Sequence, residues 1–412
     1  MTEPTTDPYN PNPYAAQPAA QPAAAPIEVQ AQTQTPPQPV LARPVKQRNA
    51  LFGWAIAGFI VVGIAVLAVL AYLLLALGPG LLLLSGFLAL IPLVVVLLGV
   101  MWIDRWEPEP RGLLIFGFLW GAGMSVALAL IVDIGVQVAV YATGTDPSVT
   151  DVLGGVVQAP VVEETAKGLG VLLIFLVARR YFDGPVDGIV YAAVVAGGFA
   201  FTENILYFAD SISYAGVLST DAALTFFVRG VMSPFAHAMF TAMTGLFIGL
   251  WGRRSVAGGI GGFFVGLLPA MLLHGIWNAT ALLGLVGWFV VYLLIQVPLF
   301  AGAIVLVVQL RKREAKLTQE RLAEYANAGW FSPSEVATLG SPAGRRYALT
   351  WAKTNGMGPL MKAYIRDATR LAFTRQRIVT GRDRIGAQRD EQELLGRVTA
   401  SRQALHAAAR PA

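Results

Sequence analysis

Long apolar runs follow one another through most of the chain, separated by short polar connections. Eight runs can be distinguished, at about residues 51–77, 81–103, 112–142, 152–178, 186–209, 223–250, 256–283 and 285–310. Each holds at least the roughly 20 residues that a helix needs to cross the hydrocarbon core of a bilayer. The pattern therefore predicts an all-α polytopic membrane protein, with a bundle of about eight transmembrane helices over residues 49–310.

The two ends of the chain have a different composition. Residues 1–48 are rich in Pro, Ala, Gln and Thr and cannot bury enough apolar surface to fold, so we expect a disordered tail. Residues 311–412 are basic and carry a helical pattern, which predicts a helical tail outside the membrane. Its basic face would suit anionic lipid headgroups, and a solvated helical tail is an equal alternative.

The basic residues predict the orientation of the bundle. Lys and Arg gather in the connections at 43–48, 105–111, 179–180, 253–254 and 311–313. The alternate connections near 78–80, 143–151, 210–222 and 284–287 contain neither residue. Because cytoplasmic loops of membrane proteins are enriched in Lys and Arg, we expect both termini to be cytoplasmic.

The overall composition agrees with a membrane protein and excludes some chemistry. Hydrophobic residues make up 55% of the chain and charged residues 13%, against about 25% charged in soluble domains. There is no cysteine, which excludes disulfides, thiolate metal sites and a cysteine nucleophile. We expect a lipid bilayer and no nucleic acid as a partner, and the oligomeric state is not predicted.

Ionisable residues nevertheless lie inside the predicted spans. Each costs roughly 2.5–3.5 kcal/mol on insertion, so each requires an explanation. With a rise of about 1.5 Å per residue, most of them fall in the outer half of the bilayer, and His237 lies deeper. We therefore expect one shared polar cavity among the helices that carry these residues: Asp133, Glu163, Glu164, Lys167, Glu203, Arg229, His237 and His274.

Helical spacing relates several of these residues to one another. Glu163 and Glu164 are adjacent and point about 100° apart, while Lys167 is one turn further on and can pair with either carboxylate. If Lys167 neutralises one, the other is left partly desolvated, as suits a general base. His274 and Asn278 are four residues apart and share a helix face.

Four short motifs lie on separate predicted spans. The segment 163–167 has the form E-E-x-x-K, and 199–204 has the form F-x-x-x-E-N. His237 is followed eight residues later by Gly245, and residues 274–278 read H-G-I-W-N. With these motifs in this order, the stretch from about 90 to 310 resembles the PrsW family of glutamic-type intramembrane proteases.

The related CAAX prenyl-protease group differs at two of these positions. Its motifs are E-E-x-x-x-R and F-x-x-x-H, whereas this chain has Lys167 as the basic residue of the first motif and Glu203 where that group has a His. The resemblance therefore favours the PrsW branch and argues against prenylated substrates.

The resemblance implies an integral protein of a bacterial cell membrane that hydrolyses a membrane-protein substrate, such as an anti-sigma factor in stress signalling. It implies a glutamate-dependent reaction without a covalent intermediate. We expect Glu163 or Glu164 to activate water and His237 to orient it or to shuttle a proton. Candidate residues of the site are Glu163, Glu164, Glu203, His237 and His274, supported by Lys167, Asn204, Asn278 and Arg229.

Donors for the oxyanion follow from residue chemistry rather than from the resemblance. Asn204, Asn278, Arg229 and His274 carry hydrogen-bond donors that could stabilise the developing charge.

Two alternatives remain open. Glu203, His237 and His274 could hold a zinc ion, although the H-E-x-x-H signature is absent and we favour a reaction without a cofactor. A non-enzymatic transporter, ion pathway or scaffold could use the same buried charges for a ligand, but no internal repeat supports it. Asp133 is expected to be a polar partner of a neighbouring helix.

Overall fold

The computed structural model describes residues 48–144, 152–382 and 384–408, and within these ranges it is all-α with no strand. The predicted N-terminal tail, apart from Arg48, lies outside the described residues, as does the connection 145–151. The all-α membrane fold predicted from the apolar runs is confirmed for the described part of the chain.

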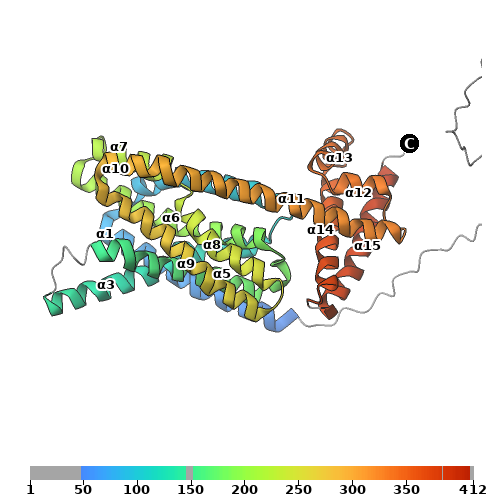
Figure 1. Cartoon of the computed structure of the whole chain (residues 1–412), viewed down its shortest axis with the longest axis horizontal. Coiled ribbons are helices and arrows are strands. Elements are labelled where there is room, and N and C mark those ends of the chain that lie inside the picture. Colours follow the sequence, from blue (N-terminus) through green and yellow to red (C-terminus); the bar gives the residue numbers. More distant parts are fainter. Residues whose placement is uncertain (1–47, 145–151, 383, 409–412) are drawn as a thin grey trace, which may run out of the picture. The chain divides into compact units, whose positions relative to one another are not determined.

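Figure 1 shows the helices of the bundle, and π-helical turns connect several of them in the sequence. These helices are α1 (Arg48–Ile103), α2 (Arg111–Leu119), α3 (Val126–Thr143), α5 (Ala159–Val177), α6 (Pro185–Ala215), α7 (Thr220–Phe226), α8 (Ala236–Gly252), α9 (Val256–Thr280), α10 (Gly284–Val291) and α11 (Val297–Asn327). The π-helical turns are Trp120–Ser125, Gly154–Gln158, Phe227–Met232 and Tyr292–Gln296.

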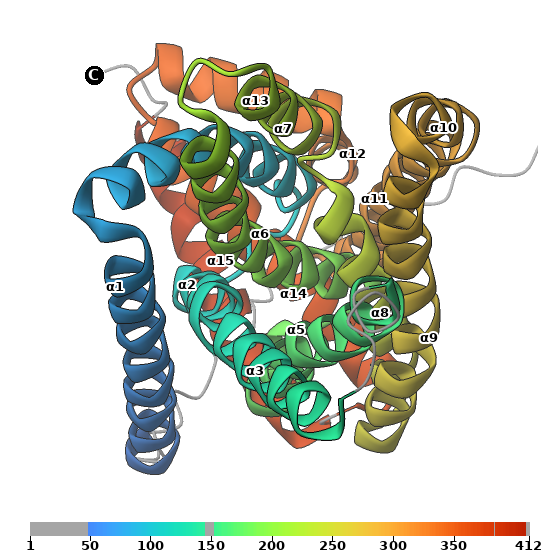
Figure 2. The same cartoon turned by 90° about the vertical axis from the view of Figure 1, so that its left-hand side faces the viewer.

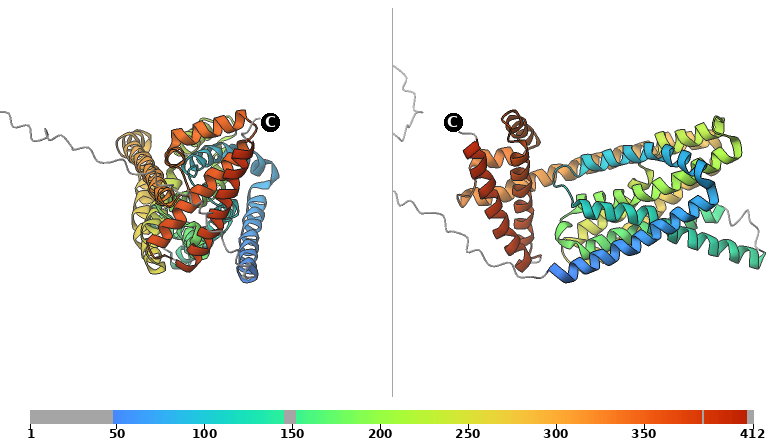
Figure 3. Two further views of the ribbon diagram at one scale, coloured as in Figure 1. Left: turned by 90° about the vertical axis from the view of Figure 1, so that its right-hand side faces the viewer. Right: turned by 180° about the vertical axis from the view of Figure 1, so that it is seen from behind.

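Five helical stretches of the described chain are long and apolar enough to cross a membrane. Two of them, with 48 and 72 residues, exceed one crossing. The first reverses direction at Gly78, whose φ of 69° favours glycine, and the second reverses near Gly284, with a φ of 67° (Figures 1 and 3). The order of helices thus agrees with the eight apolar runs, but the number that cross the bilayer stays a prediction.

Helix α6 lies in the middle of the bundle, with α1, α3 and α9 around it (Figure 2). Its glycines permit very close helix contacts. A Cβ atom added to Gly188 would lie 2.0 Å from the carbonyl oxygen of Gly245 on α8, and a Cβ atom added to Gly245 would lie 2.0 Å from the carbonyl oxygen of Gly188. Similarly, a Cβ on Gly198 would lie 2.1 Å from the carbonyl oxygen of Phe118 on α2. These crossings fix the distance between α6 and the helices beside it.

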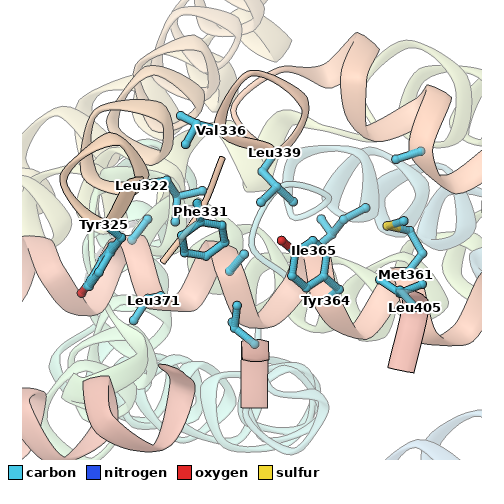
Figure 4. Close-up of a cluster of buried hydrophobic side chains, with 14 of the residues drawn as sticks. Leu322, Tyr325, Phe331, Val336, Leu339, Met361, Tyr364, Ile365, Leu371 and Leu405 are labelled. Carbon is cyan, nitrogen blue, oxygen red and sulfur yellow. The ribbon is translucent and has the colours of Figure 1, made fainter. Parts of the chain in front are cut away.

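The C-terminal helices have a hydrophobic core of their own. Helices α12 (Pro333–Leu339), α13 (Pro342–Thr354), α14 (Gly358–Val379) and α15 (Arg384–Ala408) pack with the end of α11. Leu322, Leu339 and Leu371 lie in this core (Figure 4). Because α11 continues without a break from Val297 to Asn327, the predicted boundary at residue 310 falls within a helix.

Two connections that the sequence predicts to be cytoplasmic contact this C-terminal part. Trp106 Nε1 donates a hydrogen bond to Thr318 Oγ1 at 3.1 Å, and the buried Arg345 donates to the carbonyl oxygen of Trp106 at 3.0 Å. Arg382 donates to the carbonyl oxygen of Phe182 at 3.0 Å. The C-terminal helices therefore hold the connection between α5 and α6.

In the connection between α1 and α2, burial raises the pKa of Asp104 to about 7, although a backbone hydrogen bond opposes the shift.

The α6–α8 crossing generates a prediction. We expect Gly245→Val to destabilise the protein by about 1–3 kcal/mol, because the new side chain must displace the backbone at Gly188. Thermal unfolding in detergent measures the effect. Gly302→Val is the matched control, since a Cβ at Gly302 meets no atom within 4 Å. Equal stability of the two variants would contradict this account of the crossing.

Candidate active site

The carboxylate of Glu164 joins three helices. Its Oε1 lies 2.6 Å from Lys167 Nζ, one turn further along α5, and 3.0 Å from His274 Nδ1 on α9. Its Oε2 accepts a hydrogen bond of 2.7 Å from Thr241 on α8. The side chain is fully buried, so both oxygens are committed to protein partners. Glu164 is thus a connection between helices rather than a group open to substrate.

Lys167 lies among the other ionisable groups. Its fully buried Nζ is 3.4 Å from Glu163 Oε2 and 3.4 Å from His237 Nδ1. The ammonium also lies 4.2 Å from the centroid of the Phe199 ring on α6, a favourable cation–π distance. Lys167 therefore contacts both adjacent glutamates, with the shorter distance to Glu164.

Glu163 differs from its neighbour by facing a cavity of about 760 Å³. The cavity lies among α3, the π-helical turn before α5, and α6, and both Glu163 and Glu203 line it, whereas Glu164 does not. The side chain of Glu163 is 12% exposed. Its Oε2 is 3.8 Å from His274 Nε2. Helix geometry explains the contrast, because adjacent residues of a helix point about 100° apart.

Glu203 orients His237 from the opposite side of the cavity. His237 Nε2 lies 2.9 Å from Glu203 Oε2, and the same carboxylate forms an ion pair with Arg229. Arg229 Nε donates to Asn204 Oδ1 at 2.8 Å, and its guanidinium lies 3.8 Å from the ring centroid of Tyr207. Both charges of this pair are therefore neutralised within the protein.

The two imidazoles meet next to Glu163. Their centroids are 5.1 Å apart with the rings at 90°. One nitrogen of each ring is held by a carboxylate, since His274 Nδ1 contacts Glu164 and His237 Nε2 contacts Glu203. Metal-binding imidazoles are commonly oriented by a carboxylate in this way. Glu163, His237 and His274 each offer one ligand atom, and these atoms lie within 4.8 Å of one another.

This group differs from the metal set suggested by the sequence. The sequence suggested Glu203 with His237 and His274, whereas in the structure Glu163 supplies the nearby carboxylate. The physical reason is that Glu203 is already engaged by Arg229 and His237.

Asn278, expected as an oxyanion donor, and Asp133, expected as a polar partner of a neighbouring helix, have other contacts in the structure. Asn278 donates a hydrogen bond of 2.7 Å to the carbonyl oxygen of Gly155, in the π-helical turn before α5. Asp133 is exposed, lines the cavity and accepts a hydrogen bond of 2.7 Å from Gln137 of its own helix, with no hydrogen-bond partner on another helix among the described residues. Asn278 therefore braces the helix that carries Glu163.

Thr241 was not anticipated from the sequence. It follows His237 by four residues on α8 and so shares its helix face. This spacing is the feature of the sequence from which Thr241 could have been identified.

The buried pair generates a stability prediction. Lys167→Met leaves the Glu164 carboxylate buried without its cation, which should cost about 3–5 kcal/mol. Adding Glu164→Gln removes the uncompensated charge, so we expect the double variant to be more stable than Lys167→Met. Chemical unfolding in detergent compares them. A double variant less stable than either single variant would contradict this role of Glu164.

Comparisons with known proteins identify a family and several relatives with similar sequences. Residues 109–303 match the family described as "PrsW family intramembrane metalloprotease". The chain is 29% identical over 217 residues to Protease PrsW of Clostridioides difficile (strain 630), which is 51% of this chain and 85% of that protein. It is 30% identical over 146 residues to Protease PrsW of Geobacillus kaustophilus (strain HTA426), which is 35% of this chain and 57% of the relative.

A third relative, Protease PrsW of Oceanobacillus iheyensis, is 34% identical over 122 residues, covering 29% of this chain and 51% of that protein. The alignments thus span most of the first relative and about half of the other two. No solved structure matches the chain. Residues 109–303, which hold every expected site residue, belong to the PrsW family of intramembrane proteases.

Proposed function

We propose that the chain hydrolyses a peptide bond of a membrane protein at the inner end of the cavity, with Glu163 as the carboxylate that activates water. One observation carries the choice between the adjacent glutamates: Glu163 lines the cavity, whereas Glu164 is enclosed by Lys167, His274 and Thr241. Glu163 Oε1 has no hydrogen bond among the described residues, so it is free to accept a proton.

We further propose that Glu163, His237 and His274 hold a divalent metal ion. Two imidazoles and one carboxylate form a donor set that suits catalytic zinc, and the carboxylates of Glu164 and Glu203 orient the two rings. The description of the matching family as a metalloprotease family supports this proposal. When bound, such an ion supplies a Lewis acid and an acidified water.

The protein side chains handle the proton and the developing charge. Water attacks the peptide carbonyl carbon while its proton passes to the free oxygen of Glu163. As the C–N bond breaks, Glu163 returns that proton to the leaving amine, so that a carboxylic acid and an amine result. Arg229 and Asn204 lie beside Glu203 and are not among the described residues that line the cavity, so they support Glu203 rather than contact the oxyanion. Asn278 acts instead by holding the π-helical turn.

The position of the reaction in the cell follows from the topology. We propose a bacterial cell membrane, cytoplasmic termini and a site in the outer half of the bilayer, because basic residues gather in alternate connections. An anti-sigma factor is one substrate that the family resemblance suggests.

Separate substitution of the two glutamates tests the assignment of the base. We expect Glu163→Gln to reduce cleavage of a membrane-protein substrate at least about 1,000-fold with little loss of stability, since Glu163 is partly exposed. Glu164→Gln should lower both activity and stability. The control is Glu320→Gln, at an exposed surface pair with Lys316. Unchanged cleavage by Glu163→Gln would overturn the assignment.

Metal content and the metal dependence of cleavage test the second proposal. We expect elemental analysis of protein purified without chelator to find about one divalent ion per chain, and His274→Ala to lose it. A chelator should abolish cleavage, and added zinc should restore it. Thr244→Val is the control, because Thr244 is buried on α8 outside the donor set. Full activity in metal-free protein would contradict this proposal.

A further inference from the structure

The cavity continues well beyond Glu163 as a groove along one face of α3. The residues that line it recur at helical spacing from Val126 on α3 to Gly144, which directly follows this helix, and include Asp133, Gln137 and Val140. These 18 residue steps correspond to about 27 Å of helix at 1.5 Å per residue. Val126 packs in one cluster with Phe199, which lies under Lys167, so the Val126 end is the inner end.

Asp133 differs from the other carboxylates of this groove. Glu163 lies beside Lys167, and Glu203 is paired with Arg229. Asp133 has only the amide of Gln137 as a partner among the described residues. None of the described residues that line the cavity is Lys, Arg or His. A charge in a membrane-spanning helix is costly, and the groove itself provides no cation to offset this one.

We propose that this groove binds an extended segment of the substrate and that Asp133 pairs with a Lys or Arg of that segment. An extended chain covers about 3.3 Å per residue, so 27 Å accommodates about eight residues. Asp133 is seven residues beyond Val126, or about 10 Å, which places the basic residue about three positions from the cleaved bond. The pairing rests on the proposed function and assigns it a substrate class.

The groove also offers groups for the exposed backbone of such a segment. Unpaired peptide N–H and C=O groups are costly in a membrane, so an unwound substrate needs hydrogen-bond partners. The side-chain amides of Gln137 and Gln158 line the groove on its two sides. They can donate to and accept from an extended chain.

Charge-selective labelling tests this inference without a substrate. The chain has no cysteine, so Ala129→Cys places a single thiol in the groove. We expect a cationic methanethiosulfonate to react with this thiol faster than an anionic one. The ratio of the cationic to the anionic reaction rate should fall about tenfold when Asp133→Asn is added. Asp133→Glu should preserve the ratio. Asp221→Asn is the control, because Asp221 is an exposed acid on α7 outside the groove. A ratio unchanged by Asp133→Asn would overturn the inference.

A cleavage panel tests the substrate class directly. The probe is a synthetic single-span peptide of Leu and Ala with one Lys, Gln or Glu moved through its outer half. We expect Lys about three residues beyond the cut to raise the cleavage rate at least about tenfold over Glu, and Asp133→Lys to reverse the order. Equal cleavage rates for the Lys and Glu peptides, with cleavage still lost in Glu163→Gln, would overturn the role of Asp133 but leave the proposed function standing. Cleavage that persists in Glu163→Gln, with a ratio of labelling rates that still depends on Asp133, would overturn the proposed function but not the charge of the groove.

Discussion

The ion pair between Lys167 and Glu164 is the interaction on which the arrangement of the site depends. Both side chains are fully buried, and removing two charges from water costs several kcal/mol per ion. The cost is offset because Glu164 also contacts His274 and Thr241, while Lys167 also contacts Glu163, His237 and the ring of Phe199. The pair thereby holds α5, α6, α8 and α9 in one register, and breaking it would release the two imidazoles.

Two adjacent carboxylates have different surroundings because a helix turns by about 100° per residue. Glu164 faces the helices behind it and is saturated by partners, whereas Glu163 faces the cavity and has one oxygen without a hydrogen bond among the described residues. Glu203 repeats the supporting role from α6, where it orients His237 and is neutralised by Arg229. The glycine crossing at Gly188 and Gly245 brings α6 and α8 close enough for that contact. Among the acids that line the cavity in the described part of the chain, Asp133 alone has no cation beside it.

The long apolar runs were sufficient to predict the helices, their order and the reversal at Gly78, because these features depend on local composition. Helical spacing also predicted that Lys167 reaches both glutamates. Spacing could not predict which glutamate faces the cavity, since the rotation of α5 depends on its packing against α8 and α9. The sequence suggested Glu203 for a metal set, whereas Glu163 offers the oxygen that lies within 4.8 Å of ligand atoms of His237 and His274, because Glu203 is engaged by Arg229 and His237. The partner of Asn278 was also beyond prediction, because the π-helical turn at Gly155 changes the register locally.

Side chains from separate helices lie together beside the cavity that extends along α3. An electron cryo-microscopy structure of the full chain in a lipid nanodisc tests whether this arrangement holds in a bilayer. We expect Glu163, His237 and His274 to lie within about 5 Å of one another, with lipid excluded from them and the groove open along α3. Density that placed these side chains on unrelated faces, or against acyl chains, would contradict it.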